Sequence, residues 1–167
     1  MNKMGFHPVL VLFILLTASG CGPGTGDSLA TLTEIEQAEK ALVSFFDTLH
    51  TGEYHQAVES YGGSYESLIE YNPEIDPANF AELMEAACSL NGFNCLKVKH
   101  SSLHQQVSDR EFIFIVEFQQ ADGSLFSLGP CCGEPTSGET DQNQFLYTVT
   151  KFTQTGYQVK EMPPYSP

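Results

Sequence analysis

The stretch from Phe112 to Phe118 reads Phe-Ile-Phe-Ile-Val-Glu-Phe, and it predicts the centre of a β-sheet. Large apolar side chains occupy every second position, which places them on one face of an extended strand. The positions between them begin with Ile113 and Ile115, so the first part of the strand is apolar on both faces. Such a strand is expected in the middle of a sheet, covered by helices.

Further strands are predicted on both sides of this one along the chain. Leu96 and Val98 alternate with two lysines in a strand that is expected to extend to Val107. Residues 121–124 (Ala-Asp-Gly-Ser) predict a hairpin turn. Strands are then expected at Leu125–Leu128, Phe145–Phe152 and Tyr157–Met162.

The part of the chain that precedes the strands has a helical period. Thr33-Glu34-Ile35-Glu36 fits a capping box, and apolar residues follow at spacings of three and four until Gly52. A second helix is expected from Glu53 to about Tyr61. A third is expected to begin at Asp76-Pro77, with Asp76 as its cap, and to end at Asn91-Gly92. Residues 64–75 leave open another turn of helix.

About three helices followed by about four antiparallel strands predict an α+β fold. This order of elements, across residues 33–162, resembles the nuclear-transport-factor-2-like fold, in which a curved, cone-shaped sheet wraps a long first helix. A cystatin-like α+β domain is the alternative. The resemblance implies an apolar pocket between sheet and helix, and ordinary core packing is the other interpretation of its lining. The candidate lining residues are Tyr54, Tyr61, Phe114, Phe118 and Tyr147.

The N-terminal residues are typical of an export signal. Lys3 precedes an unbroken apolar run at residues 9–16, and the small residues Ala18, Ser19 and Gly20 lead to Cys21. This pattern resembles the lipobox of bacterial lipoproteins, although Ala18 stands where that family usually has Leu. The resemblance implies removal of residues 1–20 and attachment of a diacylglycerol to the Cys21 thiol. An ordinary signal peptide is the alternative.

The same pattern predicts the domain organisation and the location. Residues 1–20 are expected to be a signal peptide, residues 21–32 the lipidated cysteine with a flexible Gly-, Ser- and Thr-rich tether, and residues 33–167 one globular domain. The protein is expected to be exported and held at a bacterial membrane by its lipid. Gly22 stands where Asp would favour the inner membrane, so the outer membrane is expected in a Gram-negative cell and the outer face of the cytoplasmic membrane otherwise.

The charge excludes two kinds of partner. The formal net charge is −14 at pH 7, and removal of residues 1–20 takes away Lys3 and no acidic residue, which makes it −15. Proteins that bind nucleic acid carry basic patches, so no nucleic-acid partner is expected. For the same reason the folded surface is not expected to dock on anionic lipid headgroups.

Four cysteines remain after Cys21 is assigned to lipid: Cys88, Cys95, Cys131 and Cys132. An even number in an exported chain predicts disulfides, and three pairings are open. A bond between the adjacent Cys131 and Cys132 would be strained. The two pairings that join Cys88 and Cys95 to Cys131 and Cys132 (the cross pairings) are therefore favoured. They would attach the loop at 129–143 to the end of the third helix by disulfide bonds. A four-cysteine zinc site is the alternative, but the spacing does not match two C-x-x-C pairs.

Other candidate sites are less specific. His100 and His104 are expected on one face of a strand, where Glu117 or Asp109 could complete a metal site, but exposed surface histidines are the simpler interpretation. No metal ligand, catalytic residue or cofactor is assigned, because no Gly-rich phosphate loop, H-E-x-x-H helix or G-x-S-x-G elbow is present. The sequence thus predicts a lipid-anchored binding or interaction module for an unknown small molecule or envelope protein. A small envelope enzyme of isomerase or hydrolase type is the alternative.

Overall fold

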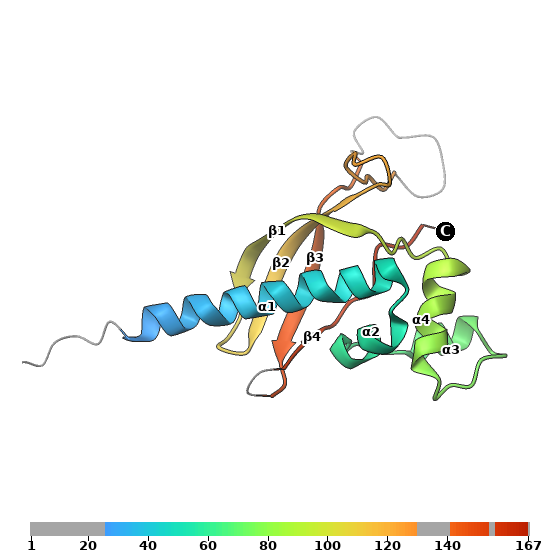
Figure 1. Ribbon diagram of the computed structural model, residues 1–167, viewed down its shortest axis with the longest axis horizontal. Coiled ribbons are helices and arrows are strands. Elements are labelled where there is room, and N and C mark those ends of the chain that lie inside the picture. Colours follow the sequence, from blue (N-terminus) through green and yellow to red (C-terminus); the bar gives the residue numbers. More distant parts are fainter. Residues whose placement is uncertain (1–25, 130–140, 154–155, 167) are drawn as a thin grey trace, which may run out of the picture.

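The computed structural model describes residues 26–129, 141–153 and 156–166. Within these ranges four helices precede four strands, which confirms the α+β class (Figure 1). The helices are α1 (Gly26–Thr51), α2 (Tyr54–Ser60), α3 (Glu66–Tyr71) and α4 (Phe80–Ser89). The strands are β1 (Lys97–Gln106), β2 (Glu111–Gln119), β3 (Phe145–Lys151) and β4 (Tyr157–Val159).

The strands form one antiparallel sheet in the order β1-β2-β3-β4, which is a simple meander. Strand β2 lies between β1 and β3, as the Phe112–Phe118 pattern predicts. Its residue Phe114 stands opposite Leu103 of β1 and Tyr147 of β3. The sheet is open, because β1 and β4 form its two edges and do not pair with each other.

Helix α1 lies across one face of this sheet (Figure 1). Every second residue of β2 is fully buried against it, while the residues between are only half-buried. The expected cover of β2 by helices is therefore found on one face only in the described part of the chain. Ile113 and Ile115 are partly shielded instead by their cross-strand neighbours, which are polar at Ser102 and Thr148. An antiparallel sheet tolerates one solvated face in this way.

The core lies between α1 and the sheet and is rich in aromatic rings. Phe46, which is fully buried, makes edge-to-face contacts with Phe45, Phe118 and Tyr147, with ring centroids 4.8–5.2 Å apart. Burial of one such side chain contributes about 2–3 kcal/mol. A second, smaller cluster of Leu68, Leu83 and Ala87 holds α3 against α4.

Two predicted helix starts are wrong. Helix α1 begins at Gly26, so Thr33 lies inside the helix and does not cap it, and the structure extends the helix into the predicted tether. Tether residues 21–25 lie outside the described ranges. Helix α4 begins at Phe80 with Asn79 as its cap. Asp76 instead accepts hydrogen bonds from the amides of Ala78 and Asn79, which makes a separate turn before the helix.

Two further segments differ from the sequence pattern. The segment left open at 64–75 contains the short helix α3. The return strand expected at Leu125–Leu128 is not a strand, because it makes only single bridges from Leu125 to Gln119 and from Leu128 to Gln142. Its apolar character is explained by Phe126, which is buried and stacks on Phe145.

Candidate functional site

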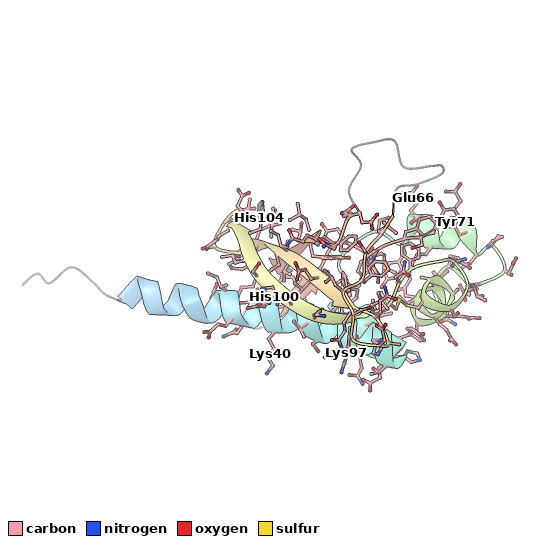
Figure 2. The ribbon with its side chains drawn as sticks, turned by 90° about the horizontal axis from the view of Figure 1, so that it is seen from above. Lys40, Glu66, Tyr71, Lys97, His100 and His104 are labelled. Carbon is pink, nitrogen blue, oxygen red and sulfur yellow. A yellow bond between two sulfur atoms is a disulfide. The ribbon has the colours of Figure 1, made fainter. Side chains whose placement is uncertain are left out.

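An exposed hollow of about 390 Å³ lies where α3, the turn after α4 and the C-terminal segment meet. Three large apolar or aromatic side chains line it and remain exposed: Tyr71 by 59 %, Leu90 by 79 % and Tyr165 by 46 %. Asn91, Gly92 and Ser166 complete the lining. We call this feature the distal hollow, since it lies at the opposite end of the molecule from Gly26 (Figures 1 and 2).

The turn after α4 presents Leu90 to solvent. The buried face of α4 carries Leu83, Met84 and Ala87, and Leu90 has the spacing of the next member of this stripe. It is nevertheless exposed, because it is the C-cap residue and the helix ends at Ser89. The amide of Leu90 donates to Ala86 O, and Gly92 then takes a positive φ of 81°. Positive φ is readily adopted by glycine and costly for other residues. The turn therefore reverses the chain into β1 at this glycine.

The C-terminal segment is fixed to this turn by backbone and side-chain hydrogen bonds. The Ser166 amide donates to Gly92 O at 2.9 Å, and the Asn94 amide donates to Pro164 O at 2.8 Å. The side chain of Asn94 also donates to Pro164 O and to the Ser166 hydroxyl. Tyr165 is thereby held beside Phe93, with ring centroids 5.3 Å apart.

Helix α3 is tied to the same turn through a buried polar side chain. The side-chain amide of Asn72 donates to Leu68 O at 2.7 Å and to the Asn91 side-chain oxygen at 2.9 Å. Asn72 is only 6 % exposed, so this pair of bonds is shielded from water. It fixes Tyr71, the neighbouring residue, relative to the turn.

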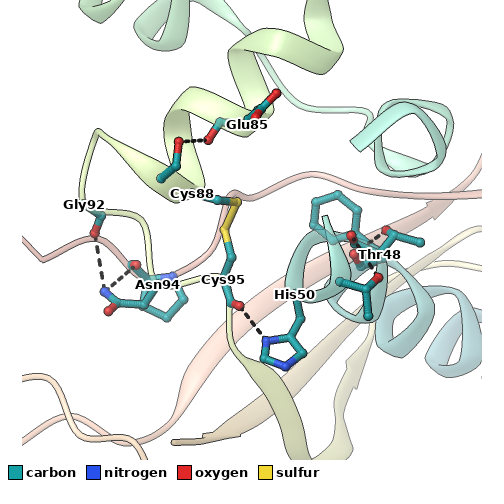
Figure 3. The surroundings of a disulfide bond; sticks show 11 residues. Thr48, His50, Glu85, Cys88, Gly92, Asn94 and Cys95 are labelled. Carbon is teal, nitrogen blue, oxygen red and sulfur yellow. Dashed lines mark hydrogen bonds between the residues drawn. A yellow bond between two sulfur atoms is a disulfide. The ribbon is translucent and has the colours of Figure 1, made fainter. Parts of the chain in front are cut away.

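A disulfide joins Cys88 of α4 to Cys95, just before β1 (Figure 3). The preference for cross pairings with Cys131 and Cys132 is therefore wrong in this structure, because the turn after α4 brings the two Cα atoms to 5.5 Å. Cys131 and Cys132 lie outside the described ranges. The bond also removes Cys88 and Cys95 as thiolate ligands for zinc. The His50 ring nitrogen Nδ1 donates to Cys95 O at 3.1 Å and links the end of α1 to this bridge.

The helices around the distal hollow carry acidic side chains without neighbouring Lys or Arg in the sequence. None of the seven Lys and Arg residues of the chain lies between Lys40 and Lys97. The Lys160 ammonium donates a hydrogen bond to Gly62 O at 2.9 Å, which brings one cation to the connection between α2 and α3. The exposed acids of the interval are Glu53, Glu59, Glu66, Glu70, Glu74, Asp76, Glu82 and Glu85.

The predicted pocket residues belong mainly to the core. Phe114 and Phe118 have no exposed surface, and Tyr61 and Tyr147 are nearly as buried. Burial, with a smaller contribution from Glu161, raises the pKa of Tyr61 to about 12 and that of Tyr147 further. Tyr61 stacks on Phe45 of α1, and Tyr147 makes edge-to-face contacts with Phe46 of α1 and with Phe118. Tyr54 lies apart, at a separate hollow between α2 and α4 that also contains His55 and Glu82.

The suggested histidine pair does not form a metal site. Strand β1 has register shifts next to His100 and at His104, so the two residues do not repeat on one face as a regular strand would place them. His100 and His104 are labelled in Figure 2. His100 stands opposite Glu117, whose carboxylate accepts a hydrogen bond from Gln144. Among the described residues, no group of three or more His, Cys, Asp or Glu is placed to hold a metal ion.

A second hollow at the other end of the sheet is lined by Glu34, Asp109, Arg110, Lys151 and Phe152. Its two cationic side chains are already engaged within the protein. Lys151 pairs with Glu34, whose hydrogen bond raises the pKa of the lysine, and Arg110 donates to the carbonyl of Lys151. Neither cation of this hollow is therefore left without a partner for a ligand to engage.

Cys21, the predicted lipidation site, lies outside the described ranges. In the part of the chain that is described, none of the helices combines the length and hydrophobicity needed to cross a bilayer. Comparison with known proteins gives no significant match to a family model, a curated protein or a solved structure.

The distal hollow was not predicted from the sequence. Tyr71, Leu90 and Tyr165 come from three segments that are far apart in the chain, and no local pattern joins them. The helical pattern is misleading for Leu90, because it lies seven residues after Leu83 and three after Ala87, a spacing that predicts burial. The helix ends at Ser89, one residue before Leu90, and this leaves the side chain exposed.

Proposed function

We propose that the chain is a lipid-anchored lipoprotein of the bacterial cell envelope and acts as an interaction module through the distal hollow. The observation that carries the proposal is that the N-terminal end of α1 and the distal hollow lie at opposite ends of the molecule. Cys21 precedes Gly26, the first residue of α1, by a stretch that spans at most about 18 Å when extended. The distal hollow lies at the far end of the molecule (Figure 1). A lipid on Cys21 would therefore leave the hollow directed away from the bilayer.

Binding is favoured over catalysis by the nature of the distal hollow. It is shallow, open and lined by exposed aromatic and apolar side chains that are held on fixed elements, which is typical of interaction surfaces. The described residues that line this hollow include no His, Asp, Glu or Lys that could act as a base beside a nucleophile. The isomerase or hydrolase alternative depends on an enclosed pocket around Tyr61 and Tyr147, and these side chains are packed into the core.

The nuclear-transport-factor-2-like resemblance is part of this proposal. Its support is the long helix α1 lying across an antiparallel meander. The open sheet and the filled centre give no support to a ligand-binding cone, so the proposed binding site is on the surface at the helical end.

The anchor is tested by fractionation of cells that express the full chain. We expect the wild type in the membrane fraction, released by non-ionic detergent but not by high salt, because acyl chains hold it there. Cys21→Ser should move the chain out of the detergent-extracted fraction. Ala18→Leu is the matched control, since it restores the usual lipobox residue and should leave the chain anchored. Retention of Cys21→Ser in the same membrane fraction as the wild type would contradict the proposal.

A further inference from the structure

We propose that the distal hollow docks a basic segment of another envelope protein, one that carries Lys or Arg together with apolar side chains. This inference rests on the proposed function and specifies the chemistry of the partner. Three properties of the described surface carry it: its exposed aromatic lining, its charge and its rigidity.

The lining suits a segment that has both cationic and apolar groups. Leu90, the most exposed of the three large side chains, can contact an aliphatic group, and Tyr71 and Tyr165 add partly exposed aromatic rings that carry hydroxyl groups. A Lys or Arg side chain over a tyrosine ring gains about 0.5–1 kcal/mol at an exposed site. Tyrosine and arginine are also enriched at protein interfaces.

The charge of the surrounding helices selects the same partner. Glu66 and Glu70 are on α3 with Tyr71, and Glu82 and Glu85 are on α4 before Leu90; all four carboxylates are exposed. A cationic segment is attracted and steered by this end, whereas an acidic one is repelled. A second copy of the chain docking hollow to hollow would bring two acidic faces together, and the same charge disfavours an anionic lipid surface.

The hollow is preorganised, which lowers the entropy lost on binding. The Asn72–Asn91 hydrogen bond and the bond from the Ser166 amide to Gly92 O join the segments that line it. The Cys88–Cys95 bridge closes the connection between α4 and β1, which contains Leu90. A partner would therefore meet Tyr71, Leu90 and Tyr165 already in place.

The proposal is tested by fluorescence anisotropy with a labelled peptide that alternates Lys with Leu and Pro, titrated with the purified full chain in non-ionic detergent. A peptide with Glu in place of every Lys is the control ligand. We expect binding of the basic peptide only, and at least tenfold weaker binding by Leu90→Ser and by Tyr71→Ser. Leu146→Ser is the matched control, because Leu146 is similarly exposed, by 56 %, on the uncovered face of the sheet.

A second pair of variants tests charge without touching the lining. Glu70→Lys should weaken binding of the basic peptide, while Glu36→Lys, an exposed site on α1, should have a smaller effect. The proposal is overturned if the peptide does not bind, if all variants bind equally, or if sedimentation shows self-association that Leu90→Ser abolishes. The binding assay is done in solution and does not depend on the lipid anchor. Absence of peptide binding would therefore overturn only this inference, and absence of membrane anchoring in the fractionation experiment would overturn only the proposed anchor.

Discussion

At the scale of single residues, Gly92 determines whether the distal hollow can form. Its φ of 81° turns the chain after α4, and its missing side chain lets the C-terminal segment approach. A Cβ atom at this position would overlap the carbonyl oxygen of Ser166. Conformation and close approach therefore both require glycine here.

We expect Gly92→Ala to lower the free energy of unfolding by more than the strain alone, which is about 1–3 kcal/mol for a non-glycine residue at positive φ. Gly123→Ala is the control, because Gly123 has a similar φ of 82° but open space around its Cα. Urea unfolding of both variants measures the difference. Equal losses would show that the contact with Ser166 has no part in the stability of the turn.

The buried tyrosines predict a loss of stability in alkali. Burial and Glu161 raise the pKa of Tyr61 from 10.0 to about 12. Between these values the unfolded chain releases the proton while the folded chain retains it, so the free energy of unfolding falls as the pH rises. Below pH 10 this contribution is fully present.

Urea unfolding at pH values across this window tests the expectation. Tyr61→Phe should reduce the fall relative to the wild type, because it removes one of the titrating groups. Tyr165→Phe, at an exposed tyrosine, should leave the fall unchanged. An identical pH dependence in all three proteins would contradict the conclusion that the raised pKa of Tyr61 contributes to the loss of stability.

At the scale of elements, the α4–β1 connection is held by both a disulfide and backbone hydrogen bonds. The disulfide spans a sequence separation of 7, and the Phe93 amide donates to Ala87 O within the same turn. Closing a loop of this length removes entropy from the unfolded chain that corresponds to about 2–3 kcal/mol.

We expect a reducing agent to lower the free energy of unfolding by about this amount while the fold persists, since the backbone bonds of the turn remain. The double variant Cys88→Ala/Cys95→Ala should be as stable as the reduced wild type and should not respond to reductant. Circular dichroism during urea unfolding follows both. A double variant that still responds would show that other cysteines control the effect.

The elements themselves were predictable where one pattern dominates. The alternation in Phe112–Phe118 predicts β2 and its central place in the sheet, and the stripe that includes Phe45 and Phe46 predicts most of α1. The predicted start of α4 was wrong because Asp76-Pro77 and Asn79 both have the residue types that can begin a helix. Only the turn made by Asp76 in the folded chain selects Asn79.

The candidate site was less predictable than the fold. The expected pocket residues are periodic and aromatic, and the same pattern describes a filled core. The distal hollow instead depends on tertiary hydrogen bonds, such as those from Asn72 to Asn91 and from Asn94 to Pro164. Bonds between segments so far apart leave no local pattern in the sequence.

At the scale of the whole molecule, the proposed anchor and the proposed docking surface lie at opposite ends of α1. The cations of the chain lie outside the interval between Lys40 and Lys97, which contains α2, α3 and α4. In this account the N-terminal end is held at the membrane by lipid, and the acidic helical end is presented to a basic partner.

The most direct test of this account is the intact mass of the chain after purification in detergent from the membranes of the cells that express it. The account predicts a polypeptide that begins at Cys21 and carries the added mass of a diacylglycerol, with or without a further acyl chain on the new amino terminus. A chain that retains residues 1–20, or one that begins near Cys21 with no added mass, would contradict it.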